Sequence, residues 1–260
     1  MSSSVQNQLA RRLRELHVPG NPIVFGNVYD AATASLVAAH PAAKAIATAS
    51  YAIAATHGAA DNDLTLEDNL ASIAKIALVA QKANLPLTVD IQDGYADLAH
   101  TIREIVRLGA VGCNLEDVDN ATNTLRPVDD AVARIKLTLA TARDAGVPDF
   151  ALNARTDVLG FDGTIEDAIA RGKAYLAAGA TTAFVWGGPK GRGVRTEEVR
   201  QLVAGLDGRV NVLRSSKTDA LTISELKDIG VARVSVGPAL YRAAMDGYKQ
   251  ALDNLLGTSA

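Results

Sequence analysis

The sequence predicts an α/β fold, a single (β/α)8 barrel that spans residues 1–260. Short apolar or β-branched runs alternate with longer Ala/Leu-rich stretches of helical periodicity. These units fill the chain, and no linker or low-complexity segment divides it. Hydrophobic residues make up 48% of the chain, which is enough to bury the core that a barrel needs.

The expected strands are short runs dominated by apolar residues, and several of them end in polar residues. The first reads Ile-Val-Phe-Gly and the third reads Pro-Leu-Thr-Val-Asp-Ile. The eight predicted strands are 23–26, 44–48, 86–91, 111–115, 149–153, 181–186, 209–213 and 232–236.

The expected helices lie between these strands, and a glycine in the manner of a C-cap closes several of them. The predicted helices are 65–83, 98–108, 128–145, 164–178, 195–205 and 218–228, and the closing glycines are Gly109, Gly146, Gly179 and Gly230. The stretch 238–256 is amphipathic and follows the last strand.

Charge and composition exclude several classes of partner. A net charge of -3 supplies no basic field for nucleic acid or for an anionic membrane. No stretch is long and apolar enough to span a bilayer. The single cysteine, Cys113, cannot form an internal disulfide, and its apolar strand indicates a packed thiol. We expect a cytoplasmic protein, with a mitochondrial address as the alternative.

Polar residues collect at the ends of four predicted strands, where a barrel carries its active site. The third strand ends in the stretch TVDIQDGYAD, which begins at Thr88. The polar residues at these ends are Thr48, Ser50 and Tyr51, then Asp90, Gln92 and Asp93, then Asn114, Glu116 and Asp117, and finally Asn153, Arg155 and Asp157.

These residue types indicate an acid anion bound beside a metal ion. The carboxylates of Asp90 and Glu116 suit Mg2+ or Mn2+, which prefer oxygen ligands. Arg155 suits a substrate carboxylate, which its planar fork can hold with two hydrogen bonds. Two alternatives stay open. Each Asp or Asn could serve only as a turn or cap residue, and Arg155 could be a structural ion-pair partner of Asp157 or Glu116.

Two other segments could contribute to a site. His57 lies in a Gly/Ala-rich loop with Asp61, and a surface role competes there with proton transfer. The segment 186–193 is Gly-rich and basic but lacks the ending of a phosphate loop, so it is expected to be a mobile rim loop.

Six ordered motifs resemble the isocitrate lyase/phosphoenolpyruvate mutase superfamily over nearly the whole chain. They are GNVYDAATASLV, KAIATASYAIAATHG, VDIQDGYAD, VGCNLEDVD with LRPVDDAVARI, NARTDV and GVARVSVGPAL. The resemblance implies a barrel whose last helix is often swapped between subunits of a dimer of dimers. It also implies Mg2+ that holds a 2-oxo acid or its enolate.

The resemblance also implies roles for individual residues. The amides of Ser50, Tyr51 and Ala52 would cradle the substrate carboxylate. Arg155, with Asn153, would bind the substrate, and the catalytic candidates are Arg155, Tyr51 and Glu116. The expected metal site and its shell are Asp61, Asp90, Glu116 and Gln92.

Two departures from the family pattern limit the reactions that the enzyme is expected to catalyse. The loop after Glu116 contains neither the Cys of isocitrate and methylisocitrate lyases nor the Lys of phosphonomutases, and Gln92 replaces a second carboxylate. The sequence therefore favours a lyase or hydrolase of oxaloacetate or a substituted malate. Carbon–phosphorus chemistry on a phosphonopyruvate-like compound and a catalytically impaired ligand-binding barrel are the alternatives.

Two details of the mechanism follow from the residues expected near the rim of the barrel. The base would be Tyr51, Tyr95 or a carboxylate acting through water. The polar loop 117–127 is expected to act as a mobile lid.

Overall fold

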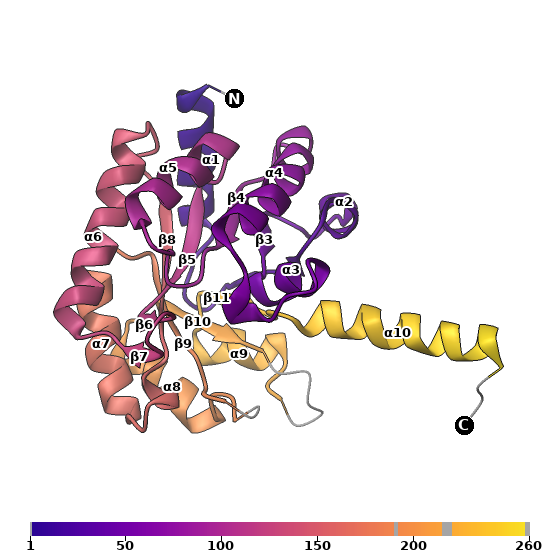
Figure 1. Cartoon of the computed structure of the whole chain (residues 1–260). Helices are drawn as coiled ribbons and strands as arrows, with labels where there is room; N and C mark the ends of the chain where they lie inside the picture. Colours follow the sequence, from indigo (N-terminus) through magenta and orange to yellow (C-terminus); the bar gives the residue numbers. More distant parts are fainter. Residues whose placement is uncertain (1, 190–191, 215–219, 258–260) are drawn as a thin grey trace.

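The computed structural model describes residues 2–189, 192–214 and 220–257, and its centre is a curled parallel sheet (Figure 1). The order of the nine strands in this sheet is β1-β11-β10-β9-β8-β5-β4-β3-β2. Their bounds are β1 Ile23–Val24, β2 Asn27–Val28, β3 Ile46–Thr48, β4 Leu87–Asp90, β5 Gly112–Glu116, β8 Ala151–Thr156, β9 Thr182–Val185, β10 Val210–Leu213 and β11 Arg233–Ser235.

The two edges of this sheet are parts of one extended stretch. β1 pairs with β11 and β2 pairs with β3, and only Phe25 and Gly26 separate β1 from β2. The Phe25 amide donates to the Val234 carbonyl at 2.9 Å, which carries the pairing with β11 across the break. The sheet is therefore consistent with the predicted (β/α)8 barrel.

Each predicted strand overlaps an observed one, and the largest difference lies in β8. The sequence predicts a strand over 149–153, whereas β8 runs through Arg155 to Thr156. Its end is extended because Arg155 is in register with Glu116 on β5 and Thr156 with Val185 on β9. Pairing on both sides thus holds Arg155 in the sheet.

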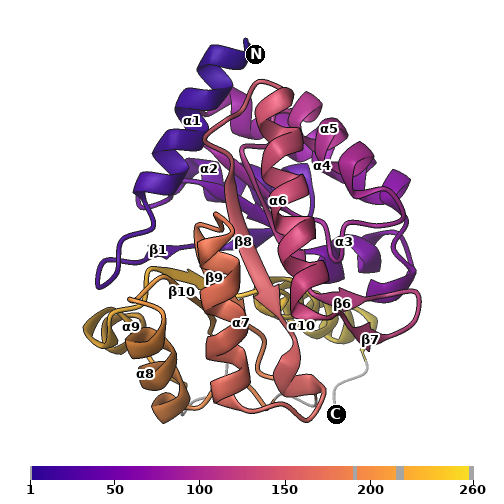
Figure 2. The same ribbon diagram turned by 90° about the vertical axis from the view of Figure 1, so that its left-hand side faces the viewer.

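The described residues form ten α-helices, and Figure 2 shows α6 and α7 side by side next to β8. Their bounds are α1 Ser3–Glu15, α2 Ala31–Ala39, α3 Ser50–Thr56, α4 Leu66–Lys82, α5 Leu98–Leu108, α6 Val128–Asp144, α7 Ile165–Ala177, α8 Thr196–Gly205, α9 Ile223–Ile229 and α10 Ala239–Leu256.

The predicted helix ends agree closely with the structure, except in α9. Gly109 and Gly230 are left-handed C-caps, with φ of 105° and 106°, as the sequence predicts. The helix predicted over 218–228 begins at Ile223, because Thr222 accepts from the Glu225 amide as its N-cap. Residues 218 and 219 of that prediction lie outside the described residues.

The last helix differs from the others because it projects from the body (Figure 1). None of its residues is buried, and its apolar side chains Leu240, Met245, Tyr248, Leu252, Leu255 and Leu256 are exposed. Among the residues described, no helix is both long and apolar enough to cross a membrane.

Candidate active site

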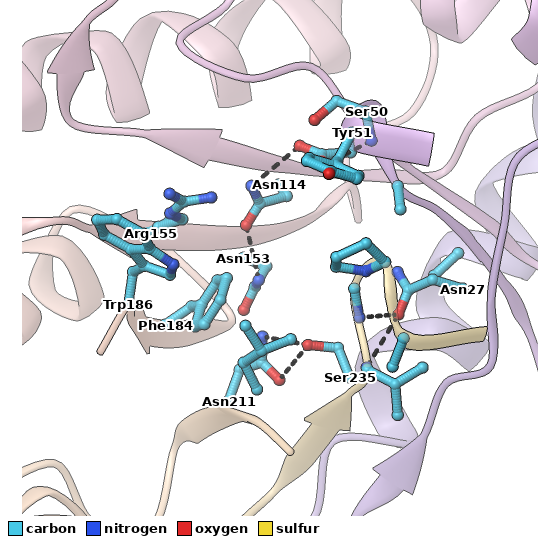
Figure 3. Close-up of a pocket in the computed structure, with 18 of the residues that line it drawn as sticks. Asn27, Ser50, Tyr51, Asn114, Asn153, Arg155, Phe184, Trp186, Asn211 and Ser235 are labelled. Carbon is cyan, nitrogen blue, oxygen red and sulfur yellow. Dashed lines mark hydrogen bonds between the residues drawn. The ribbon is translucent and has the colours of Figure 1, made fainter. Parts of the chain in front are cut away.

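A cavity of about 430 Å³ lies at the carboxyl ends of the strands (Figure 3). Polar groups of Ser50, Asp61 and Asp90 line part of it, and Phe184 and Trp186 form an aromatic wall elsewhere. This is the position that the sequence predicts, because strands of a parallel barrel present their ends on one face.

Asp90 is fixed at the end of β4 by three donors. Its Oδ2 accepts from the Ser50 amide at 3.1 Å, and its Oδ1 accepts from the Asn114 side chain at 3.2 Å. The third is the Gln92 amide, at 3.3 Å from Oδ1. Thr48 further anchors the Asp90 backbone, since its hydroxyl accepts from the Asp90 amide at 2.8 Å. The carboxylate therefore has a set orientation within the cavity.

Gln92 joins Asp90 to a second carboxylate, Asp61. Its side-chain nitrogen donates to the Asp61 backbone oxygen at 2.6 Å and to Asp61 Oδ1 at 3.0 Å. The left-handed backbone of Gln92, with φ of 52°, turns the chain at this point. Burial, and next the charge of Asp90, raise the pKa of Asp61.

A second charged group of the site is centred on Arg155. Asp157 accepts two of its hydrogen bonds, at 2.6 Å and 2.7 Å, and Glu116 accepts a third at 2.7 Å. Burial raises the pKa of Glu116 despite Arg155, because one guanidinium is shared with Asp157 and further carboxylates lie nearby. The ion pairs weighed as an alternative from the sequence are thus both present.

Arg155 nevertheless faces the cavity. A guanidinium has five N–H groups, and in the part of the chain that is described only three of those of Arg155 have partners. Its central carbon lies 5.1 Å from the Trp186 ring centroid and 5.6 Å from that of Phe184 (Figure 3). Two N–H groups therefore remain for a ligand.

The carboxylates fit a hard cation held largely through water. Among the described residues, no group of three or more His, Cys, Asp or Glu side chains is placed to hold a metal. Asp61 and Asp90 form a linked pair whose mutual repulsion a cation would relieve, and Mg2+ often binds through only one or two carboxylates. Because Glu116 is paired with Arg155, it suits the outer shell better than direct ligation.

The segment Ser50-Tyr51-Ala52 forms the first turn of α3 beside the cavity. Two of its amides are already engaged, since Ser50 donates to Asp90 and Ala52 donates to the Ala49 carbonyl at 3.2 Å. Tyr51 is 40% exposed, and its ring centroid lies 5.0 Å from the Arg242 guanidinium carbon, so Tyr51 lies at the mouth of the cavity.

Further amide and hydroxyl side chains line the cavity, and the predicted residue Asn153 is one of them. Asn153 donates to Asn114 at 2.9 Å and accepts from Thr182 at 2.7 Å, which extends the polar chain that begins at Asp90. Farther along the curled sheet, Asn27, Asn211 and Ser235 also line the cavity, and these three were not predicted from the sequence (Figure 3). The sequence feature that could have identified such residues is an Asn inside an apolar strand, as in Val-Asn-Val-Leu at 210–213.

Other candidates lie elsewhere or only partly within the cavity. Tyr95 does not line it, and its hydroxyl accepts from Asn69 at 2.8 Å. His57 instead contacts Ser72 and Asp68, which ties α3 to α4. Trp186 to Pro189 and Gly193 of the Gly-rich rim segment do line the cavity, while Lys190 and Gly191 lie outside the described residues.

The predicted lid contains a β-hairpin, formed by β6 Val118–Asp119 and β7 Thr124–Leu125. Asp93 anchors it, since Asp93 Oδ2 accepts from the Asn120 amide at 3.1 Å and pairs with Arg126 at 3.4 Å. Asp93 therefore faces the hairpin and does not supply the charge that Gln92 lacks.

Comparison with known proteins gives the family. The family model for phosphoenolpyruvate phosphomutase matches residues 13–256. The chain belongs to the phosphoenolpyruvate mutase/isocitrate lyase superfamily. An uncharacterised protein of Mycobacterium tuberculosis is 31% identical over 89% of this chain and 83% of its own. A probable 2-methylisocitrate lyase of Corynebacterium glutamicum is 32% identical over 75% of this chain and 66% of its own.

Solved structures of the superfamily share the fold. A putative phosphonomutase from Burkholderia cenocepacia superposes with a TM-score of 0.85 at 35% identity, covering 96% of this chain and 99% of that one. A 2,3-dimethylmalate lyase gives 0.82 at 27% identity, with 95% and 87% covered. An oxaloacetate acetylhydrolase in complex with oxalate gives 0.83 at 25% identity, with 96% and 86% covered. The superfamily is one of carbon–carbon lyases and mutases, and this chain is an enzyme of that kind.

Proposed function

We propose that this enzyme is a Mg2+- or Mn2+-dependent lyase or hydrolase that cleaves a carbon–carbon bond in a small 2-oxo or 2-hydroxy dicarboxylate, of the oxaloacetate or substituted malate type. The observation that carries the proposal is the linked carboxylate pair Asp61 and Asp90, which lies in the same cavity as Arg155. Relatives named 2,3-dimethylmalate lyase and oxaloacetate acetylhydrolase support the dicarboxylate class, and one named 2-methylisocitrate lyase supports carbon–carbon cleavage.

Different residues would bind the cation, bind the substrate carboxylate and transfer protons. When bound, the cation would stabilise the negative charge of an enolate, and Asp61 and Asp90 would hold it, with Gln92 and Glu116 around its waters. The two remaining N–H groups of Arg155 would bind the substrate carboxylate, assisted by Asn153. Tyr51 is the phenol that lines the cavity, so it replaces Tyr95 as the acid–base candidate.

The absence of Cys and Lys from 117–125 argues against the usual loop acid of the family. The similarity to a putative phosphonomutase makes carbon–phosphorus chemistry the second candidate. Assays of oxaloacetate, 2,3-dimethylmalate, 2-methylisocitrate and phosphonopyruvate, with and without Mg2+, separate the two. Turnover of a dicarboxylate that stops in Asp90→Ala supports the proposal, whereas turnover of phosphonopyruvate alone refutes it.

We further propose that the enzyme is a homo-oligomer, a dimer or a tetramer, in which α10 packs on a neighbouring subunit. The exposed apolar side chains of α10 support this, because an amphipathic helix gains stability only when its apolar face is covered. Pro238, Ala239 and Arg242, at the start of α10, also line the cavity, so assembly and site geometry would be linked.

A further inference from the structure

Arg233 is a buried cation that the proposed reaction does not use. It lies on β11, is only 4% exposed and lines the same cavity as Asp90 and Arg155. Within the described ranges, no carboxylate lies within 4.0 Å of its guanidinium, and its Nε–H is buried without a hydrogen-bond partner. An unpaired buried charge is costly, so a compensating group is expected.

The neighbours of Arg233 do not supply a negative charge. Its guanidinium carbon lies 4.5 Å from the Phe25 ring centroid, and one terminal nitrogen lies 3.5 Å from His17 Nε2. His17 is neutral, because burial and then the charge of Arg233 lower its pKa to about 3. Since His17 Nδ1 donates to the Leu13 carbonyl at 2.7 Å, Nε2 can only accept from Arg233.

Arg233 itself stays charged near neutral pH. Burial lowers its pKa to about 10, which is still well above physiological pH. The charge of Asp90 acts in the opposite direction and raises the pKa of Arg233, although the two make no ion pair within 4.0 Å. The positive charge is therefore retained inside the barrel.

A second unsatisfied polar group lines the same cavity. The hydroxyl of Thr88 is buried and has no partner among the described residues. Thr88 precedes Asp90 by two positions on β4, so its side chain lies on the same face of the sheet and deeper in the barrel. Asn211, in register with Arg233, adds an amide to this region.

We propose that Arg233, together with Thr88 of the same cavity, forms an anion subsite on the floor of the cavity that takes a carboxylate or similar oxyanion. The inference rests on the proposed function for its substrate, whose far carboxylate would occupy this floor while its 2-oxygen end lies at Asp61 and Asp90. The planar guanidinium can present two parallel N–H groups to such a carboxylate. A free inorganic anion is the other source of the same chemistry.

Calorimetric binding of malate and of its 4-amide, both with Mg2+, tests the floor subsite. The amide keeps the 2-hydroxy acid end but loses the far charge. We expect wild type to bind malate about tenfold or more tightly than the amide. Arg233→Met should remove this preference, Arg233→Lys should retain part of it, and Thr88→Val should reduce it. Circular dichroism and thermal unfolding check that each variant folds, and the Thr88 variant serves if Arg233→Met does not.

Two controls separate the outcomes. Binding of oxalate with Mg2+ reports the end of the cavity that holds Asp61, Asp90 and Arg155, without the floor. Failure of wild type to bind oxalate would therefore refute the proposed function rather than the floor subsite. Inorganic phosphate that binds wild type but not Arg233→Met, with no malate preference, would assign the floor to a free anion. Equal affinities for malate and its amide, together with no phosphate binding, would overturn the subsite.

Discussion

At the scale of single residues, the charges of the site are arranged in linked groups. Gln92 connects Asp61 with Asp90, and Arg155 connects Glu116 with Asp157. Gln92 makes its link through its backbone amide and its side-chain amide, whereas Arg155 uses three N–H groups of one guanidinium. Substitutions that keep charge but change this geometry are therefore the most informative.

Arg155→Lys should lower catalytic efficiency while the fold is kept. Lysine keeps the charge but loses the planar fork that binds Asp157 and a carboxylate, so we expect a loss of ~2–4 kcal/mol in transition-state binding. The measurements are kcat/KM and the melting temperature, with Arg107→Lys on the exposed face of α5 as the matched control. Unfolding of the variant with normal kinetics of the folded fraction would make Arg155 structural.

Gln92→Asp should strengthen Mg2+ binding. The substitution adds a negative charge beside Asp61, where Gln92 now contributes only an amide. Titration calorimetry of Mg2+ in the presence of oxalate should give tighter binding for this variant and weaker binding for Asp90→Ala. The exposed substitution Gln8→Asp controls for net charge. Equal affinities in every variant would show that these residues do not form a metal site.

Asp61 should make the free energy of unfolding depend on pH when no divalent cation is bound. Burial and Asp90 raise its pKa in the folded protein, so the proton that it holds adds stability. That stability is fully present below the ordinary pKa of 3.8 and is lost as the pH rises through the raised value. Urea unfolding should show this slope flattened in Asp61→Asn and unchanged in Asp63→Asn, in the same short turn; equal slopes would contradict it.

At the scale of elements, strand ends and the loops after them carry the site. β4 ends at Asp90, and the chain then passes from Gln92, which faces Asp61, to Asp93, which holds the hairpin of β6 and β7. One peptide bond thus separates Gln92, which links the two carboxylates, from Asp93, the anchor of the predicted lid. Ligand binding and the position of the hairpin should therefore be coupled.

Limited proteolysis of residues 117–127 checks this coupling. Mg2+ with oxalate should protect the segment in wild type, as expected for a lid that closes over a ligand. Asp93→Asn should raise cleavage without ligand, because it weakens the contacts to Arg126 and Asn120. Asp97→Asn, at the N-cap of α5, is the control outside the hairpin. Identical digestion with and without ligand would argue against a lid.

At the scale of the whole molecule, α10 is the element that the rest of the chain leaves uncovered. Mass measurement in solution should give a multiple of 27.1 kDa. Leu252→Glu on α10 should lower that mass, because a charge would enter the buried interface. Leu78→Glu, on the exposed face of α4, should not. A wild-type mass of a single chain would contradict the proposed assembly.

The sequence by itself determined the family, the alternation of strands and helices, and the positions of Asp90, Glu116 and Arg155 at strand ends. These features follow from local periodicity and from motifs in a fixed order, so they can be read without knowing any long-range contact. Helix ends could also be predicted from the sequence, since a glycine such as Gly109 ends its helix through its own left-handed backbone conformation.

Only the tertiary structure decided which of these residues meet. Asp93 turns to the hairpin although it is adjacent to Gln92, and Tyr95 leaves the cavity, because left-handed backbone at Gln92 and Tyr95 breaks the alternation of a strand. Arg233 reaches the cavity of Asp90 only through the curl and register of the sheet. Contacts between residues so far apart along the chain depend on how strands pair, and no local pattern encodes that pairing.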